Sequence, residues 1–227
     1  GHPFLLKLET TQPTGAFKLR GALNALAHLP PDAKGVTCCS TGNHGRAVAY
    51  AARARGLKAV VCMSALVPQT KIDGIRALGA EVRIVGRSQD DALAESRRLA
   101  AEDGLVEISP FDDPHVIAGQ GTIGLELLQD APDLDTILVP LSGGGLAAGV
   151  ALAMVRGAAM QASIAAGHPV EVVEVESLAD SLGGGIGLDN RLSFALCRDL
   201  LDEVILVREE EIYRAMQALY FEERMVA

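Results

Sequence analysis

The sequence contains no tryptophan, and aromatic residues make up only 4% of it. A core must therefore be built mainly from Ala, Leu, Val and Ile, as in an α/β protein, in a chain that is 49% hydrophobic and 22% charged. Basic residues are also too few for a nucleic-acid-binding face, because 20 Lys and Arg against 29 Asp and Glu give a net charge of −9. No apolar run approaches the roughly 20 residues of a membrane span. Neither nucleic acid nor a membrane is expected as a partner.

Cysteine is scarce as well, with only Cys38, Cys39, Cys62 and Cys197 in the chain. Neighbouring residues on a strand point to opposite faces, so Cys38 and Cys39 are poorly placed to bind one metal ion together. No C-x-x-C or paired Cys/His spacing occurs. We expect buried free thiols in a reducing compartment and no metal site. No signal-peptide pattern is present, and the protein is predicted to be cytoplasmic.

Short apolar runs alternate with helical patterns, which predicts parallel sheets covered by helices. Strands are expected at residues 4–8, 35–39, 59–63, 81–85, 105–108 and 136–140, and helices at 21–29, 44–55, 70–78, 89–102, 119–128 and 146–154. A further helical pattern at 157–166 follows directly, where the alternation requires a strand. Both ends read as cut, so the sequence is expected to be part of a longer protein.

Lys18 lies in the run TGAFKLRG (residues 14–21), at the expected start of a helix and beside an aromatic residue. A helix N-terminus disfavours cations, so helix stability does not explain a lysine at this place. It is either a solvated surface lysine, which is the commoner case, or a lysine whose charge is compensated. Schiff-base formation would remove much of that cost and turn the amine into a covalent anchor.

Two further runs follow strands. STGNHG (residues 40–45) combines hydroxyls, glycine and helix-start N–H groups, which suits a carboxylate. Simple helix capping by Ser or Thr explains the hydroxyls equally well, but it leaves Asn43 and His44 unexplained. VPLSGGGL (residues 139–146) has three consecutive glycines that can turn several N–H groups toward one phosphate.

The glycine run also fits the dinucleotide pattern G-x-G-x-x-A through Gly143, Gly145 and Ala148. That pattern is weak alone, and the acidic residue expected about 20 positions later is not clear. A nicotinamide interpretation also leaves Lys18 and the Asn43 turn without a role. An amino acid joined to pyridoxal phosphate presents an imine, a carboxylate and a phosphate, which are the three groups that the three runs suit.

Together these runs resemble the fold-type II (tryptophan-synthase β-like) family of pyridoxal-phosphate enzymes, in its serine/threonine dehydratase and serine racemase branch. The resemblance is carried by KLE (7–9), QPTGAFKLRGA (12–22), STGNHG (40–45), KIDGIRALGAE (71–81), IAGQGTIGLE (117–126), residues 139–149 and LAD (178–180). It covers nearly the whole chain in order. It implies pyridoxal 5′-phosphate as cofactor and an amino acid as the small-molecule substrate.

The resemblance also implies a role for each motif residue. Lys18 would carry the cofactor and, once freed by substrate, abstract the α-proton. Phe17 would pack beside the cofactor ring, and Asn43 would bond its phenolic oxygen. The phosphate would be held by Ser142, Gly143, Gly144, Gly145 and Leu146, and the substrate carboxylate by Ser40, Thr41 and His44.

The implied reaction is β-elimination of water from a small β-hydroxy amino acid such as threonine or serine, giving a 2-oxo acid and ammonia. An amino-acid racemase on the same scaffold is the alternative, with Thr41 as a second acid/base where serine racemase has a serine. The serine-first loop and residues 178–190 also resemble a dehydratase subgroup linked to hydroxyectoine breakdown. A nicotinamide-dependent oxidoreductase is the distant alternative.

For architecture, the family implies two three-layer α/β domains, each with a parallel sheet, and a cleft between them. Residues 35–111 would form the smaller, substrate-carboxylate domain. Residues 1–34 and 112–227 would form the larger, pyridoxal-phosphate-binding domain, incomplete at both ends. Ligands would lie where the carboxyl ends of strands face the cleft. The family also implies a homodimer or a higher homo-oligomer.

Overall fold

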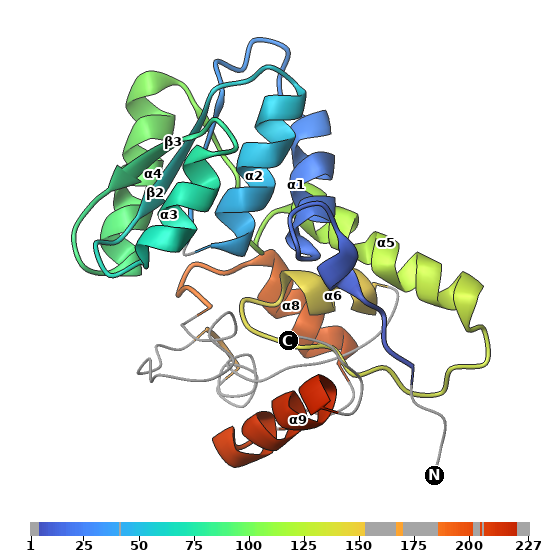
Figure 1. Cartoon of the computed structure of the whole chain (residues 1–227). Coiled ribbons are helices and arrows are strands. Elements are labelled where there is room, and N and C mark those ends of the chain that lie inside the picture. The colour runs from blue at the N-terminus through green and yellow to red at the C-terminus, as the bar shows by residue number, and fades with distance from the viewer. Residues whose placement is uncertain are drawn as a thin grey trace.

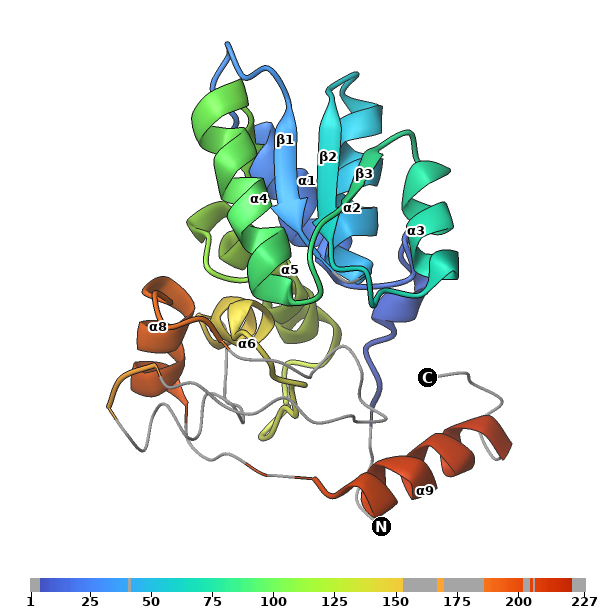
Figure 2. The ribbon, with the colours of Figure 1, turned by 90° about the vertical axis from the view of Figure 1, so that its left-hand side faces the viewer.

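The computed structural model describes residues 5–40, 42–152, 167–169, 186–201, 205 and 207–221. Its four strands are all parallel and form one sheet in the order β3-β2-β1-β4, and Figure 2 shows β1, β2 and β3 side by side. They are β1 (Val36–Cys39), β2 (Ala59–Met63), β3 (Glu81–Ile84) and β4 (Val106–Glu107). The predicted α/β class with a parallel sheet is confirmed. Thr41 and the helical pattern at 157–166 lie outside the described residues.

Helices cover both faces of this sheet, because neighbouring side chains of β2 point to opposite sides. Val60 and Cys62 pack with residues of α4, whereas Val61 and Met63 belong to the cluster that includes α2. All five residues of β2 are buried, as expected for a parallel strand covered on both faces. The helices are α1 (Lys18–Ala27), α2 (Asn43–Ala54), α3 (Gln69–Arg76), α4 (Gln89–Asp103), α5 (Pro114–Asp130), α6 (Gly145–Ala151), α8 (Leu192–Leu200) and α9 (Glu209–Phe221), with a short 3-10 helix η1 at Glu9–Thr11.

Helix α5 starts five residues before the predicted position. The Asp113 carboxylate accepts hydrogen bonds from the N–H groups of His115 and Val116, each at 2.8 Å, and Pro114 occupies the first helical position. Both features favour a helix start, and together they outweigh the apolar periodicity on which the prediction rested.

Two predicted strands are wrong within the described residues. Residues 5–8 and 136–140 have strand-like sequences, but the structure assigns them no strand. A strand is stabilised by hydrogen bonds to a neighbour, and the only sheet among the described residues is the one formed by β1 to β4. The apolar side chains of Leu5 and Leu138 consequently stay about two-thirds exposed.

Helix α5 packs against both α1 and α6 (Figure 1). A Cβ atom at Gly119 would lie 2.6 Å from the carbonyl oxygen of Arg20 in α1. One at Gly149 in α6 would lie 2.7 Å from the backbone nitrogen of Gly121. Since neither crossing leaves room for a side chain, these glycines let α5 lie close to both α1 and α6.

The described residues contain no helix long and apolar enough to cross a membrane. That part of the chain also has no group of three or more His, Cys, Asp or Glu side chains placed to hold a metal ion. The cysteines are free thiols, and Cys38, Cys62 and Cys197 are buried. Burial raises the pKa of the Cys39 and Cys197 thiols to about 12, so both stay protonated at neutral pH.

Candidate active site

The candidate site lies at the carboxyl edge of the sheet, where parallel strands of an α/β fold commonly bind ligands. Strand β1 leads to Ser40 and the start of α2, and its neighbour β4 leads to residues 108–111. Because β1 and β4 are parallel and paired, both connections leave the sheet at the same edge.

Residues 108–111 bring the three predicted motifs together. The Ile108 carbonyl accepts a hydrogen bond from His44 Nε2 at 2.9 Å, and the Pro110 carbonyl accepts one from Lys18 Nζ at 2.6 Å. Phe111 packs so closely on the glycine loop that a Cβ atom at Gly145 would lie 2.7 Å from its Cα atom. A segment of four residues therefore contacts the lysine, the α2 start and the glycine loop. Sequence reasoning missed it, although its position after a predicted strand was a usable signal.

Lys18 is the first residue of α1, and its amine is directed inward. The Nζ atom lies 2.6 Å from the Pro110 carbonyl oxygen and 5.3 Å from the ring centroid of Phe17. Burial lowers the pKa of the Lys18 amine to about 8, because desolvation disfavours the charged form. About a tenth of the amine is thus uncharged at pH 7, and the uncharged form is the one that a nucleophile or a general base requires.

The start of α2 is capped by Ser40. Its Oγ atom accepts hydrogen bonds from the N–H groups of Gly42 at 3.1 Å and Gly45 at 2.8 Å. The simple capping role that the sequence left open for this serine is therefore present. The N–H groups of Asn43 and His44 have no acceptor within the described part of the chain. Together with the positive end of a 12-residue helix, they suit an anion.

His44 is buried and electrically neutral. Since its Nε2 donates to the Ile108 carbonyl, Nδ1 is unprotonated, and Nδ1 has no hydrogen-bond partner among the described residues. Burial, and next the charge of Lys18, lower the pKa of the imidazole to about 3. In this state the ring has no free N–H for a carboxylate. The predicted carboxylate contact of His44 can then come only from its backbone N–H. Asn43 is exposed, and Thr41 lies outside the described residues.

The glycine loop (residues 142–146) leads into α6, and Ser193 of α8 contacts it. Gly144 has a φ of 90°, a left-handed conformation that favours glycine. The Gly143 carbonyl accepts hydrogen bonds from Ser193 Oγ at 2.8 Å and Asn190 Nδ2 at 3.4 Å. In a trans peptide the next N–H points the opposite way, so the Gly144 N–H is directed away from Ser193 and Asn190.

The remaining donors of the loop are also available. Backbone N–H groups from Gly143 to Leu146 have no acceptor in the described ranges. Ser142 and Leu146 are half-buried, and the three glycines are buried. Four successive N–H groups with a backbone that glycine allows to turn form the type of cradle that binds phosphate.

Asp112 follows Phe111 and contacts the start of α8, which lies 79 to 81 positions later in the sequence. Its carboxylate accepts hydrogen bonds from the N–H groups of Arg191, Leu192 and Ser193, at 2.8 to 3.0 Å, and so caps α8. Sequence reasoning recognised Asp112 only as a turn residue and missed Asn190 and Ser193. No local pattern signals a contact between such distant parts of the chain.

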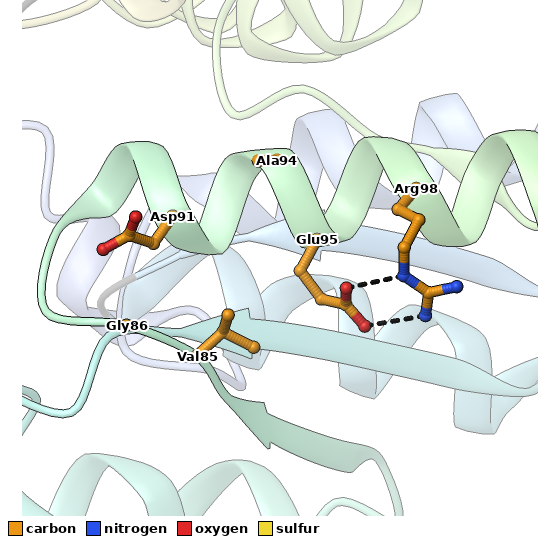
Figure 3. Close-up of a pocket in the computed structure, with 6 residues that line it drawn as sticks. All are labelled: Val85, Gly86, Asp91, Ala94, Glu95 and Arg98. Carbon is orange, nitrogen blue, oxygen red and sulfur yellow. Dashed lines mark hydrogen bonds and ion pairs between the residues drawn. The ribbon is translucent and has the colours of Figure 1, made fainter.

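A separate surface pocket lies over the connection from β3 to α4 (Figure 3). Its charged groups are paired. Glu95 accepts two hydrogen bonds from Arg98, at 2.8 and 2.9 Å, and Asp91 accepts from the backbone N–H groups of Arg87 and Ser88. None of the predicted site residues lines it. The candidate site is therefore the place where Lys18, the α2 start and the glycine loop converge.

This site fits pyridoxal phosphate. The buried amine of Lys18 suits its aldehyde, and the N–H groups from Gly143 to Leu146 suit its phosphate. The N–H groups of Asn43 and His44 suit the carboxylate of an amino acid. A nicotinamide dinucleotide would use the glycine loop alone.

Comparisons with known proteins agree with a site for pyridoxal phosphate. The family model described as "Pyridoxal-phosphate dependent enzyme" matches residues 1–227. A Sinorhizobium fredii protein named "Putative threonine dehydratase" is 57% identical, over 97% of this chain and 71% of that protein. An L-threonine ammonia-lyase of Geobacter sulfurreducens is 43% identical, over 96% of this chain and 58% of that protein. The chain thus spans 71% of the first relative and little more than half of the second.

Solved structures have the same fold. Processed threonine deaminase isoform 2 of Solanum lycopersicum aligns with a TM-score of 0.88 and 37% identity, over 97% of this chain and 68% of that one. Maize serine racemase aligns with a TM-score of 0.88 and 35% identity, over 96% of this chain and 70% of that one. These matches exclude the nicotinamide interpretation of the glycine loop. The chain belongs to the pyridoxal-phosphate-dependent enzymes of fold type II, in the branch that contains threonine dehydratases and serine racemases.

Proposed function

We propose that this chain carries the active site of a pyridoxal-phosphate-dependent dehydratase that acts on a small β-hydroxy amino acid such as threonine or serine. The observation that carries the proposal is the desolvated Lys18 amine, 2.6 Å from the Pro110 carbonyl, where the His44 and glycine-loop segments meet. The names of the relatives, a threonine dehydratase and an L-threonine ammonia-lyase, support the reaction.

Lys18 would link covalently to the cofactor and later move the substrate proton. When bound, pyridoxal phosphate withdraws electrons from the substrate Cα and makes its hydrogen acidic. Lys18, with a pKa of about 8, can take that proton on Nζ when the amine is uncharged. The Pro110 carbonyl would hold the resulting ammonium group. The Phe17 ring, beside Nζ, would shield the amine from water.

The backbone would hold the two anionic groups. N–H groups of Ser142, Gly143, Gly144, Gly145 and Leu146 would bind the phosphate. At the start of α2, the N–H groups of Asn43 and His44 would bind the carboxylate, assisted by Ser40 and Thr41. The side chain of Asn43, which is exposed, would reach the phenolic oxygen of the ring.

The proposed reaction is balanced. The Cα proton moves to Lys18, the Cβ–O bond breaks, and the hydroxyl leaves as water after taking up a proton. The resulting enamine, once released, takes up water and loses its nitrogen as ammonia. Threonine therefore gives 2-oxobutanoate and ammonia, with no oxidant or reductant required.

The test is replacement of Lys18. The purified chain with pyridoxal phosphate is expected to show a visible absorption band, and borohydride should fix the cofactor on the peptide containing residue 18. Threonine, serine and hydroxyectoine are then assayed for 2-oxo acid and ammonia. Lys18→Ala should abolish both the band and the products, with Lys34→Ala as the matched control at an exposed lysine. A band that survives Lys18→Ala would rule out this assignment.

Racemisation is the second candidate, and the similarity to maize serine racemase favours its inclusion. It requires an acid/base on the face of the substrate opposite Lys18, for which Thr41 is the sequence candidate. Measuring D-serine beside pyruvate separates the two reactions, because L-serine gives pyruvate by elimination and D-serine by racemisation. Thr41→Val should lower D-serine formation more than pyruvate formation if Thr41 has this role.

The domain boundaries, at residues 35–111 for the smaller domain and 1–34 with 112–227 for the larger, remain predictions. The same holds for the homodimeric or larger assembly and for the cytoplasmic location. Light scattering on the purified protein measures the assembly, and limited proteolysis measures the boundaries.

A further inference from the structure

Arg20, two residues after Lys18, uses all of its hydrogen-bond donors. Its guanidinium bonds both oxygens of Glu9, at 2.7 and 2.9 Å, and both oxygens of Glu126, at 2.6 and 2.8 Å. A fifth bond, at 3.0 Å, reaches Thr122 Oγ1. A guanidinium has five N–H groups, so this arrangement satisfies every one of them.

The contact differs from an ordinary surface ion pair. The side chains of Arg20 and Glu9 are only 15% and 16% exposed, and both carboxylates bind in the two-bond geometry that is strongest for arginine. Lys7 lies 2.8 Å from Glu126 on the outer side. Hydrogen bonds from Arg20, and next from Lys7, lower the pKa of Glu126 to about 2, so Glu126 stays charged throughout the neutral range.

The three partners of Arg20 come from two other elements. Glu9 lies in η1, Arg20 in the first turn of α1, and Thr122 and Glu126 in α5. Arg20 therefore ties the beginning of α1 to elements on two sides. Figure 1 shows η1, α1 and α5 next to one another.

Arg20 and Lys18 point to different sides of α1. Successive residues of an α-helix are rotated by about 100°, so two positions along the helix correspond to about 200°. Arg20 consequently faces η1 and α5, while Lys18 faces the Pro110 carbonyl. Two backbone contacts also tie this turn to α5: the Gly21 N–H donates a hydrogen bond to Gln120 Oε1 at 3.2 Å, and Gly119 packs on the Arg20 backbone. The Arg20 side chain adds the connection to η1 through Glu9.

We propose that Arg20 is a positioning residue for Lys18, and that its double carboxylate contact sets the rotation of the first turn of α1 and thereby the place of the Lys18 amine. The proposal rests on the covalent role of Lys18 in the proposed function. Lysine at position 20 would keep the positive charge, but it cannot form paired bonds to two carboxylates.

The experiment compares Arg20→Lys with Arg83→Lys. Arg83 also joins two carboxylates, Glu81 at 2.7 Å and Glu95 at 2.9 Å, but it lies in β3 and binds within β3 and α4. The full chain is mixed with pyridoxal phosphate, and the rate at which the visible band forms is followed. Borohydride then fixes the linked fraction for peptide mass analysis, and kcat and KM are measured separately.

Arg20→Lys is expected to slow formation of the covalent link by about 10-fold to 100-fold and to lower kcat by a similar factor, with a smaller change in KM, because misplacement of a reacting group by about 1 Å has effects of this size. Arg83→Lys should leave the linking rate within about 2-fold, even where both variants lower the melting temperature by the same amount. Link formation by Arg20→Lys at the wild-type rate would overturn the proposal.

A second variant covers the case in which Arg20→Lys does not fold. Glu126→Gln keeps the size of the side chain and removes one carboxylate whose side chain is 39% exposed. It is expected to slow link formation in the same direction, and an unchanged rate would contradict the proposal. Failure of the proposed function gives a different result. Wild type would then form the covalent link but release no ammonia, and the effect of Arg20→Lys on the linking rate could still be measured.

Discussion

Replacement of Lys18 by methionine is expected to stabilise the cofactor-free chain near neutral pH, although it removes the group on which the proposed activity depends. Methionine has a similar length and no charge. Lys18 as a whole residue is half-buried, and its amine has the Pro110 carbonyl as its one hydrogen-bond partner among the described residues. A charge held in such a place costs free energy unless its solvation is replaced.

The magnitude follows from the pKa of the amine, which burial lowers from 10.5 to about 8. At about pH 7 this difference corresponds to a penalty of about 3 kcal/mol for the folded chain. The hydrogen bond from Nζ to the Pro110 carbonyl is lost in the variant, which offsets about 1.5 kcal/mol of the gain. The net stabilisation by Lys18→Met is therefore expected to be about 1 to 2 kcal/mol.

The pH dependence is the sharper test. Since the folded pKa lies below the unfolded one, the penalty is complete below about pH 8 and disappears as the pH rises toward 10.5. The stability of wild type should thus rise relative to Lys18→Met by about 1 kcal/mol between pH 7 and pH 9.

Urea unfolding followed by far-ultraviolet circular dichroism, at both pH values, measures the two free energies. Lys34→Met, at an exposed lysine, serves as the matched control and should show a far smaller change between the two pH values. A difference between wild type and Lys18→Met that is the same at pH 7 and pH 9 would refute the desolvation of Lys18.

Three other predictions test the surroundings of the site. Gly119→Ala should lower the free energy of urea unfolding by about 1 to 3 kcal/mol and slow the linking of cofactor, because its Cβ would lie 2.6 Å from the Arg20 carbonyl oxygen. Its control is Gly74→Ala, where nothing lies within 4 Å of the added Cβ, and this variant should be neutral or stabilising. His44, with its pKa lowered to about 3, contributes stability that is complete above about pH 6.5 and is lost as the pH falls; wild type should lose about 2 kcal/mol more than His44→Gln between pH 7 and pH 5, and equal losses would contradict the neutral buried ring. Asp112→Ala removes the cap of α8, so it should lower the free energy of unfolding by about 0.5 to 2 kcal/mol and speed the loss of cofactor in dialysis. Unchanged cofactor retention would contradict a contribution of α8 to the phosphate site.

The sequence predicted the sheet well where a strand is buried on both faces. Residues 59–63 are all apolar or sulfur-containing, and they form β2 with the predicted bounds. The prediction failed for residues 136–140, although their composition is also strand-like. Composition reports the tendency of a segment to extend, whereas strand formation also requires a hydrogen-bonding neighbour.

Ser40 shows the same limit within the site. Its sequence context allowed either a ligand contact or a helix cap, and the two are distinguished only by the position of its Oγ atom. That atom lies 2.8 Å from the Gly45 nitrogen and 3.1 Å from the Gly42 nitrogen. Local sequence could identify both possibilities but could not choose between them.

By itself the sequence determined the α/β class, the family, and the three runs that contain Lys18, Asn43 and the glycines, because these depend on local pattern and residue type. Only the tertiary structure decided that Pro110 and Phe111 join those runs, and that the Gly143 carbonyl binds Ser193 of α8. It also decided the charge state that favours chemistry at Lys18. Desolvation and contacts between residues 92 positions apart are properties of packing, and no window of sequence contains them.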